Sequence, residues 1–282
     1  MIKGWRFYSN AMIPTCAPHE EPDLTPIADK SIWKTGKKVL FVRYTTDFDC
    51  DNTNWWYVIK DTPFDIAKIK AKRRYEINKG IKNFDVKRVK AVDYVEKIYD
   101  IQQQSFLAYP PQYRPVSIRE NFIEQFKLCD QDGSIILGAF NRESGELCGY
   151  CVLNEGERDV NFAVLKAVPE YEKLGINAAL VNAVLCFYNE ELLAGKKYIC
   201  DGSRNIVHKT AFQDYLEKYF EFRKAYCKLV IEYNPKYKWI FKVCYVFRKI
   251  FYLLDKSKIF HKVNSILKME EIVREQRKNE KK

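Results

Sequence analysis

The sequence predicts an α+β fold in which a mixed, mostly antiparallel sheet is flanked by helices, with an N-terminal α/β lobe before it and amphipathic helices after it. From Ser134 to Tyr233 the pattern runs through three strands, a helix, a strand, a helix and a strand, with short polar turns that suit antiparallel pairs. From Lys236 onward 14 Lys or Arg stand against 5 Asp or Glu, which leaves 34 basic and 32 acidic residues before that point. The net charge of +11 therefore belongs mainly to the C-terminal segment, and the body is nearly neutral.

The N-terminal part is expected to form a loop and then a small α/β lobe. The first 35 residues are rich in proline and predict a long ordered loop. Two strands are expected at 39–44 and 54–59, where β-branched and aromatic residues are bounded by Asp and Asn. Helical spacing begins after Pro63, and Gly80 is expected to end that helix as a C-terminal glycine before a strand at 84–89.

The remaining elements follow from the spacing of apolar residues and from breaks in it. Helices are expected at 92–108, 117–130, 176–193 and 207–220, with Pro110-Pro111 dividing the first two. Strands are expected at 134–140, 147–153, 159–167, 197–200 and 222–233. We divide the chain into an N-terminal loop and lobe (1–90), a central domain (91–235) and C-terminal helices (236–282).

The nine cysteines suit a reducing compartment, because their number is odd and most lie in apolar runs. Cys148 and Cys151 have the spacing of a redox pair, but they lie within a predicted strand, where residues three apart point to opposite faces. No second pair follows at the spacing of zinc ligands. The N-terminus lacks the apolar core and cleavage site of a signal peptide, so we expect a cytoplasmic protein.

The order of strands and helices from Ser134 to Tyr233 resembles the core of the GNAT acyltransferases. In that family a turn between a strand and a helix binds the pyrophosphate of acyl-coenzyme A through backbone N–H groups and the helix N-terminus. The matching turn here keeps Gly175, with Glu172 and Asn177 at its outer positions. The resemblance implies cofactor contacts by Leu174, Gly175, Ile176, Asn177 and Ala178. The alternative is a helix that merely begins after a glycine turn.

A second resemblance is carried by the segments Asp201–Asn205, His208–Thr210, Phe212–Leu216 and Phe220–Lys224, together with the basic helix Lys72–Gly80. They resemble the Fem-like branch of the superfamily, whose members transfer amino acids from aminoacyl-tRNA onto peptidoglycan precursors. The resemblance covers about Trp55 to Pro235 and implies one complete GNAT domain with a reduced first lobe. It implies an acyl or aminoacyl transferase that uses acyl-CoA (acetyl-CoA) or aminoacyl-tRNA, without a metal, on an amine of a cell-envelope precursor or amino sugar.

Three residues are candidates for the chemistry, because amide formation needs a proton removed from the amine and returned to the leaving group. His208 begins a helix directly after a strand end and is the candidate base, or else a capping or core residue. Tyr215 lies on the same helical face and is either the acid or an ordinary core aromatic. Asp201 orients His208 or binds the acceptor amine, or caps the next helix.

Six further residues are candidates for substrate binding. Arg204 suits a phosphate or carboxylate, or is a solvated loop charge. His19 and Glu20 stand in a cluster between two prolines and either line the acceptor site or form a rigid surface turn. The Fem-like resemblance adds Asn205, Gln213 and Arg74.

The C-terminal segment predicts two amphipathic helices, at 237–254 and 259–276. Lys238, Lys242 and Lys249 form a basic stripe on the first helix, whose other surface is apolar. The pattern indicates a helix at an anionic membrane surface, which would place the protein at the inner face of the membrane, or a helix docked on its own protein. The lysines interrupt the apolar run too often for a transmembrane span.

Two other functions stay open. A catalytically silent GNAT-fold module would bind lipid or partner proteins through its basic helices. Nucleic-acid binding as the main function is disfavoured by the near-neutral body, although the Lys72–Lys82 helix and the tail would suit the phosphates of a tRNA. We expect no DNA partner.

Overall fold

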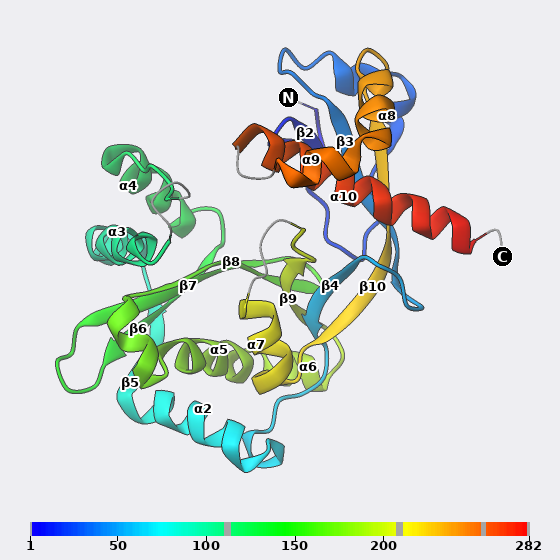
Figure 1. The fold of residues 1–282 in the computed structure, drawn as a ribbon. Helices are drawn as coiled ribbons and strands as arrows, with labels where there is room; N and C mark the ends of the chain where they lie inside the picture. The colour runs from blue at the N-terminus through cyan, green and yellow to red at the C-terminus, as the bar shows by residue number, and fades with distance from the viewer. Residues whose placement is uncertain (1, 110–113, 207–210, 255–257, 281–282) are drawn as a thin grey trace. The chain divides into compact units, whose positions relative to one another are not determined.

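The structure, a computed structural model, describes residues 2–109, 114–206, 211–254 and 258–280. The chain forms two compact units, and each is discontinuous in sequence (Figure 1). Unit 1 contains Met1–Val58, Ser203–Ala211 and Lys224–Lys282, and unit 2 contains Ile59–Gly202 and Phe212–Arg223. The predicted segments 1–90, 91–235 and 236–282 are therefore interleaved in these units, and the division into three domains stays a prediction.

Unit 1 is built on strands in the order β1-β2-β3-β10. Their bounds are Trp5–Tyr8, Ala11–Pro14, Phe41–Cys50 and Arg223–Tyr233. The β2–β3 pair is parallel, and the β1–β2 and β3–β10 pairs are antiparallel. The chain passes from unit 1 to unit 2 within β4 (Trp56–Lys60).

The prediction of a long loop over the first 35 residues is wrong. These residues form β1, β2, a short helix α1 (Thr25–Ala28) and a 3-10 turn η1 (Ser31–Trp33). The two residues between β1 and β2, Ser9 and Asn10, both have positive φ, at 47° and 64°. A two-residue turn with both φ values positive matches the twist of a hairpin, so the Ser-Asn pair closes the β1–β2 hairpin.

The sheet of unit 1 carries a core on each face. On one face Trp5, Met12, Ile32 and Val42 belong to the same buried cluster. On the other, Phe41, Leu229 and Ile231 pack with residues of α10 (Lys258–Asn279), namely Met269, Ile272 and Val273. The predicted helix at 259–276 is thus confirmed, and it docks on its own protein.

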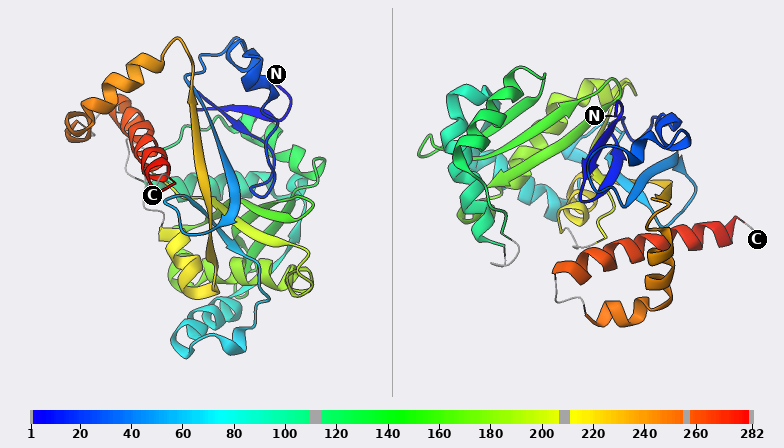
Figure 2. Two further views of the ribbon diagram at one scale, coloured as in Figure 1. Left: turned by 90° about the vertical axis from the view of Figure 1, so that its right-hand side faces the viewer. Right: turned by 90° about the horizontal axis from the view of Figure 1, so that it is seen from above.

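The predicted single helix at 237–254 is instead two helices. They are α8 (Lys238–Val246) and α9 (Arg248–Leu253), separated at Phe247, whose ψ of 13° departs from helical geometry. Both precede α10 in the chain and pack against it (Figure 2).

Unit 2 has strands in the order β9-β8-β7-β6-β5. In chain order they are β5 Phe84–Val89, β6 Ile135–Asn141, β7 Leu147–Glu155, β8 Asp159–Ala167 and β9 Tyr198–Ser203. All neighbouring pairs are antiparallel except β8–β9, which is parallel. The fold is therefore a mixed α+β fold with mostly antiparallel strands flanked by helices, as predicted.

The helices of unit 2 connect these strands and pack on them. Their bounds are η2 Ile66–Lys68, α2 Ala71–Asn83, α3 Ala91–Leu107, α4 Arg119–Lys127, η4 Leu128–Asp130, η5 Pro169–Leu174, α5 Ile176–Phe187, α6 Asn189–Leu193 and α7 Ala211–Phe220. The predicted helix at 176–193 is therefore two helices, α5 and α6, which meet at Tyr188.

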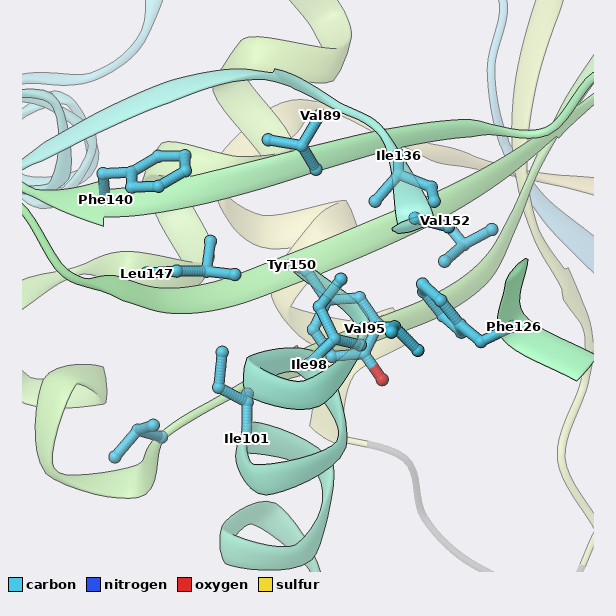
Figure 3. Close-up of a cluster of buried hydrophobic side chains, with 12 residues drawn as sticks. Val89, Val95, Ile98, Ile101, Phe126, Ile136, Phe140, Leu147, Tyr150 and Val152 are labelled. Atoms are coloured by element: carbon cyan, nitrogen blue, oxygen red, sulfur yellow. The ribbon is translucent and has the colours of Figure 1, made fainter. Parts of the chain in front are cut away.

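One core of unit 2 lies between α3, α4 and one face of β6 and β7 (Figure 3). Val95 and Ile98 of α3 and Phe126 of α4 pack there with Tyr150 and Val152 of β7. Helix α5 is apolar on most of its surface, and most of its residues from Ile176 to Leu185 are buried. Such a helix needs protein on several sides, which α2 and the sheet provide.

Gly80 does not end its helix, contrary to the prediction, because α2 continues to Asn83. A Cβ at Gly80 would lie 2.4 Å from the carbonyl oxygen of Gly175 and 2.9 Å from the amide nitrogen of Ala179. The glycine is needed for the close crossing of α2 over the first turn of α5.

Candidate functional site

Asp201 lies near the carboxyl end of β9, where the parallel pairing with β8 has just ended. That pairing covers three pairs, from Asp159–Tyr198 to Asn161–Cys200, whereas β8 continues to Ala167 and β9 to Ser203. In sheets that contain parallel strands, ligands commonly bind at the carboxyl ends of the strands. The position therefore suits a functional carboxylate.

Burial raises the pKa of the Asp201 carboxyl. Removal from water raises the pKa of its carboxyl from 3.8 to about 7, and a hydrogen bond from the Gln213 side chain opposes that shift. Gln213 belongs to α7, so α7 provides the neighbour that holds the carboxyl in place. A carboxyl with a pKa near 7 exchanges a proton readily at neutral pH, as a general base must.

Tyr215 belongs to an aromatic cluster that fixes α7 on β8. The ring of Phe212 lies 6.4 Å from Phe162 of β8 and stacks at 6.1 Å on Tyr215, whose ring is 4.8 Å from Tyr219. Burial, and then the nearby Glu76 carboxylate, raise the pKa of the Tyr215 hydroxyl above its ordinary value. Tyr215 therefore remains a proton donor at neutral pH, and its ring has the packing of a core aromatic.

Arg204 and Asn205 lie in unit 1, whereas Asp201, Gln213, Tyr215 and Arg74 lie in unit 2. The Arg204 guanidinium is 4.5 Å from the centroid of the Trp56 ring, and its Nη1 donates to the carbonyl oxygen of Asn54 at 2.6 Å. Burial lowers the pKa of Arg204. The Lys224 ammonium lies 4.6 Å from the same ring. The Trp56 ring thus contacts two cations. In the sequence, only the Trp55-Trp56 pair draws attention to this position.

The other predicted substrate-binding residues have local contacts. In unit 1, Glu20 accepts a hydrogen bond from the Ala17 amide at 2.9 Å and closes its own turn, and the His19 ring lies 6.4 Å from Phe48. In unit 2, Arg74 donates to the carbonyl oxygen of Ala67 at 2.9 Å and holds the segment before α2. Roles of these residues toward a substrate stay predictions.

The predicted cofactor turn is buried against α2. Gly175, Ile176 and Ala178 are buried, and Asn83 of α2 donates to the carbonyl oxygen of Leu174 at 3.1 Å. Gly175 has φ 85° and connects η5 to α5. The turn therefore has a packing role, and its role toward a cofactor, including that of Asn177, stays a prediction. His208, the candidate base, lies outside the described residues.

A cluster of charged residues at the end of β4 was not predicted from the sequence. Lys60 is 1% exposed, and its ammonium donates to the Thr62 hydroxyl at 2.9 Å and lies 3.7 Å from the Glu221 carboxylate. Burial lowers the pKa of Lys60. Next to it, Nε of Arg223 donates to both carboxylate oxygens of Asp61, at 3.1 and 3.0 Å. A lysine within an apolar strand carries no sequence signal for such a cluster.

Cys148 and Cys151 are both buried in β7, and burial raises the pKa of each thiol, to about 12 for Cys151. Thiols of this kind are poor nucleophiles, which agrees with the interpretation against a redox pair. Within the described ranges, no group of three or more His, Cys, Asp or Glu side chains is placed to hold a metal ion. In the same part of the chain, no helix has the length and apolarity needed to cross a membrane.

Comparison with solved structures shows the fold. The chain is similar to L-PGS from Bacillus licheniformis, with a TM-score of 0.51 and 13% identity over 95% of this chain and 84% of that one. It is similar to FemX, with a TM-score of 0.51 and 8% identity over 77% and 78% of the two chains. A conserved protein of unknown function from Bacteroides thetaiotaomicron matches with a TM-score of 0.51 and 12% identity over 78% of each chain.

No protein-family model and no curated protein matches the sequence. At identities this low the likeness to solved structures establishes the fold and nothing further. The chain therefore shares its fold with L-PGS and FemX, and the GNAT and Fem-like assignment stays a prediction.

Proposed function

We propose that the protein is an N-acyltransferase that moves an acyl or aminoacyl group from acyl-CoA or aminoacyl-tRNA to an amine of a cell-envelope precursor or amino sugar. The observation that carries the proposal is Asp201, a partly buried carboxyl near the end of β9 whose pKa is raised to about 7. The fold shared with FemX and L-PGS supports a transferase.

The Asp201 carboxylate takes a proton from the acceptor amine as the amine nitrogen attacks the carbonyl carbon of the donor. The bond between that carbon and the thioester sulfur of acyl-CoA, or the ester oxygen of aminoacyl-tRNA, breaks, and the leaving thiolate or alkoxide takes up one proton. Alternate residues of β8 turn their backbone N–H groups away from β7, and those beyond Asn161 are suited to polarise the carbonyl. Tyr215, protonated at neutral pH, is the proposed proton donor to the leaving group.

Helix α2 supports aminoacyl-tRNA as the donor. Its buried side faces α5 through Ile77 and Gly80, while Lys72 and Lys82 are exposed to solvent near its two ends. Exposed lysines along one helix suit the phosphates of a nucleic acid. The burial of Gly175 beneath the same helix also weighs against coenzyme A bound at that turn.

A turnover assay tests the proposal. The full chain is incubated with a radiolabelled acetyl-CoA or aminoacyl-tRNA and an amine library, and Asp201→Asn is compared with Asp214→Asn, an exposed position of α7. We expect Asp201→Asn to lose about 10²- to 10⁴-fold in rate, as for loss of a general base, with little change in Asp214→Asn. Equal rates in both variants would remove Asp201 from the mechanism. His208→Ala tests the second candidate base in the same way.

A catalytically silent module is the second candidate function, and the buried turn at Gly175 favours it. Thermal unfolding with acetyl-CoA or charged tRNA distinguishes the two, because a ligand at 100 times its Kd stabilises a protein by about 2.7 kcal/mol. Stabilisation by either donor supports the transferase, and no stabilisation by both supports the silent module.

A further inference from the structure

Helices α8 and α9 present an apolar surface to solvent. Eight large apolar side chains are exposed on this short stretch: Trp239, Ile240, Val243, Val246, Phe247, Ile250, Leu253 and Leu254. Val246 and Leu253 are 71% and 83% exposed. Single exposed apolar residues are ordinary, but a contiguous group of this size marks a surface that contacts something else.

The opposite side of the two helices is already fixed to unit 1. The ring of Phe241 stacks on Tyr233 of β10 at 4.5 Å. The ring of Tyr245 lies under the guanidinium groups of Arg248 and Arg274, at 4.4 and 3.9 Å. The inner side of the two helices is therefore packed on unit 1, and the apolar surface is their solvent-facing side.

Contacts to α10 also hold α9. Nε of Arg248 donates to the Glu271 carboxylate at 2.6 Å, and Asn264 donates to the carbonyl oxygen of Phe251 at 2.9 Å. The Phe251 ring lies 5.8 Å from Phe260. Since α10 packs into the core of unit 1 through Met269 and neighbouring residues, the outer surface of α9 is rigidly supported.

The charge of this stretch identifies the partner. From Tyr233 to Leu254 the chain has five Lys or Arg and no Asp or Glu. Arg248 is paired with Glu271, whereas Lys236, Lys238, Lys242 and Lys249 are exposed. Apolar and aromatic side chains flanked by lysines suit a bilayer surface that carries negative charge. A symmetric contact between two copies would instead bring the lysines of one copy against those of the other.

We propose that α8 and α9 dock the protein on an anionic membrane, with the apolar side chains of 239–254 inserted at the headgroup boundary and the lysines on the phosphates. The sequence predicted membrane contact by residues 237–276. Because α10 packs into the core of unit 1, the proposed contact is limited to α8 and α9. The inference is independent of the proposed transfer reaction, so a chain that binds vesicles without activity would retain it.

Vesicle flotation of the full chain tests the docking. Point variants are required, since removal of the C-terminal segment would also strip α10 from the core. We expect the chain to float with vesicles of phosphatidylcholine and phosphatidylglycerol and much less with phosphatidylcholine alone. Val246→Ser with Leu253→Ser should weaken binding at least tenfold, because burial of one such side chain is worth about that much. The matched control is Val92→Ser with Leu193→Ser, at positions 57% and 74% exposed in unit 2.

The charge contribution is tested separately. Lys242→Gln with Lys249→Gln should weaken binding to anionic vesicles about 25-fold, from about fivefold per lysine near the surface. Lys127→Gln with Lys196→Gln, at exposed positions of unit 2, should leave binding unchanged.

Trp239, which is 64% exposed, reports insertion directly. Vesicles with brominated acyl chains should quench its fluorescence, and Trp239→Phe should lose the quenching while the chain still floats. Failure of the full chain to float with anionic vesicles would overturn the proposal, as would equal losses in the control variants. A dimer that Val246→Ser with Leu253→Ser dissociates, without vesicle binding, would show that a second copy covers the surface and would also overturn it.

Discussion

Replacement of Asp201 by Asn should change the pH dependence of stability in a way that needs no substrate to observe. Asp201 is partly buried near the end of β9, and loss of water contact raises its pKa from 3.8 to about 7. Asn has nearly the same shape but carries no charge at any pH. The difference in the free energy of unfolding between the variant and the wild type therefore isolates the cost of ionising this buried carboxyl.

The sign follows from proton binding. Because the pKa is higher in the folded state, the folded protein binds more protons than the unfolded chain between about pH 4 and pH 7, and stability falls as the pH rises through that window. Raising the pKa from 3.8 to about 7 corresponds to about 4 kcal/mol of free energy. Asp201→Asn should thus gain up to about 4 kcal/mol relative to the wild type between pH 4 and pH 8.

Urea unfolding followed by far-ultraviolet circular dichroism, at intervals from pH 4 to pH 8, measures this difference. Asp214→Asn, at an exposed position of the same unit, is the control for removing an aspartate that is not buried. A difference between Asp201→Asn and the wild type that stays constant with pH would refute the reasoning. So would an equal pH dependence in the Asp214→Asn control.

Three further predictions concern packing and burial. Gly80→Ala should lower the free energy of unfolding by about 1–2 kcal/mol, because the added methyl meets backbone atoms at the start of α5 at 2.4 and 2.9 Å and this overpacking outweighs the better helix propensity. Asn78→Ala, at an exposed position of the same helix, should not lower it. The midpoints of urea unfolding of the two variants test this difference. Lys60→Met should leave stability unchanged or raise it at pH 7, because an apolar chain of similar size avoids the cost of a buried cation; a loss of more than about 2 kcal/mol in thermal unfolding would contradict this. Thiol labelling should modify the exposed Cys186 first and Cys151, buried with a pKa of about 12, only on unfolding; early labelling of Cys151, located by peptide mass spectrometry, would show that β7 opens locally.

Most of the fold was predictable because periodicity reports burial of one face. The strands at 134–167 and the helix at 259–276 have strong patterns and lie close to where they were expected. The hairpin at Ser9 and Asn10 was missed because neither residue is glycine, although both adopt positive φ. Gly80 was misinterpreted because a glycine near a helix end commonly terminates the helix, and its true cause is a tertiary contact with Gly175.

The candidate site was predictable only in part. Asp201 and Gln213 were both selected from the sequence, and the structure brings them into hydrogen-bond contact. Trp56 and Lys60 could not be selected, because their environments depend on residues far away in the chain, Lys224 and Glu221. Long-range pairings of this kind leave no mark on local composition.

The discontinuous make-up of unit 1 bears on the order in which the chain can fold. Its N-terminal strands share a core with Met269, Ile272 and Val273 of α10. That core cannot form until these residues, more than 200 positions further along the chain, have been synthesised. Unit 2 is drawn mostly from one continuous stretch, 59–202. During synthesis that stretch can begin to fold while the N-terminal strands still lack β10, which pairs with β3, and the core residues of α10. We therefore expect the N-terminal strands to be the segment most exposed to chaperones and proteases until α10 emerges from the ribosome.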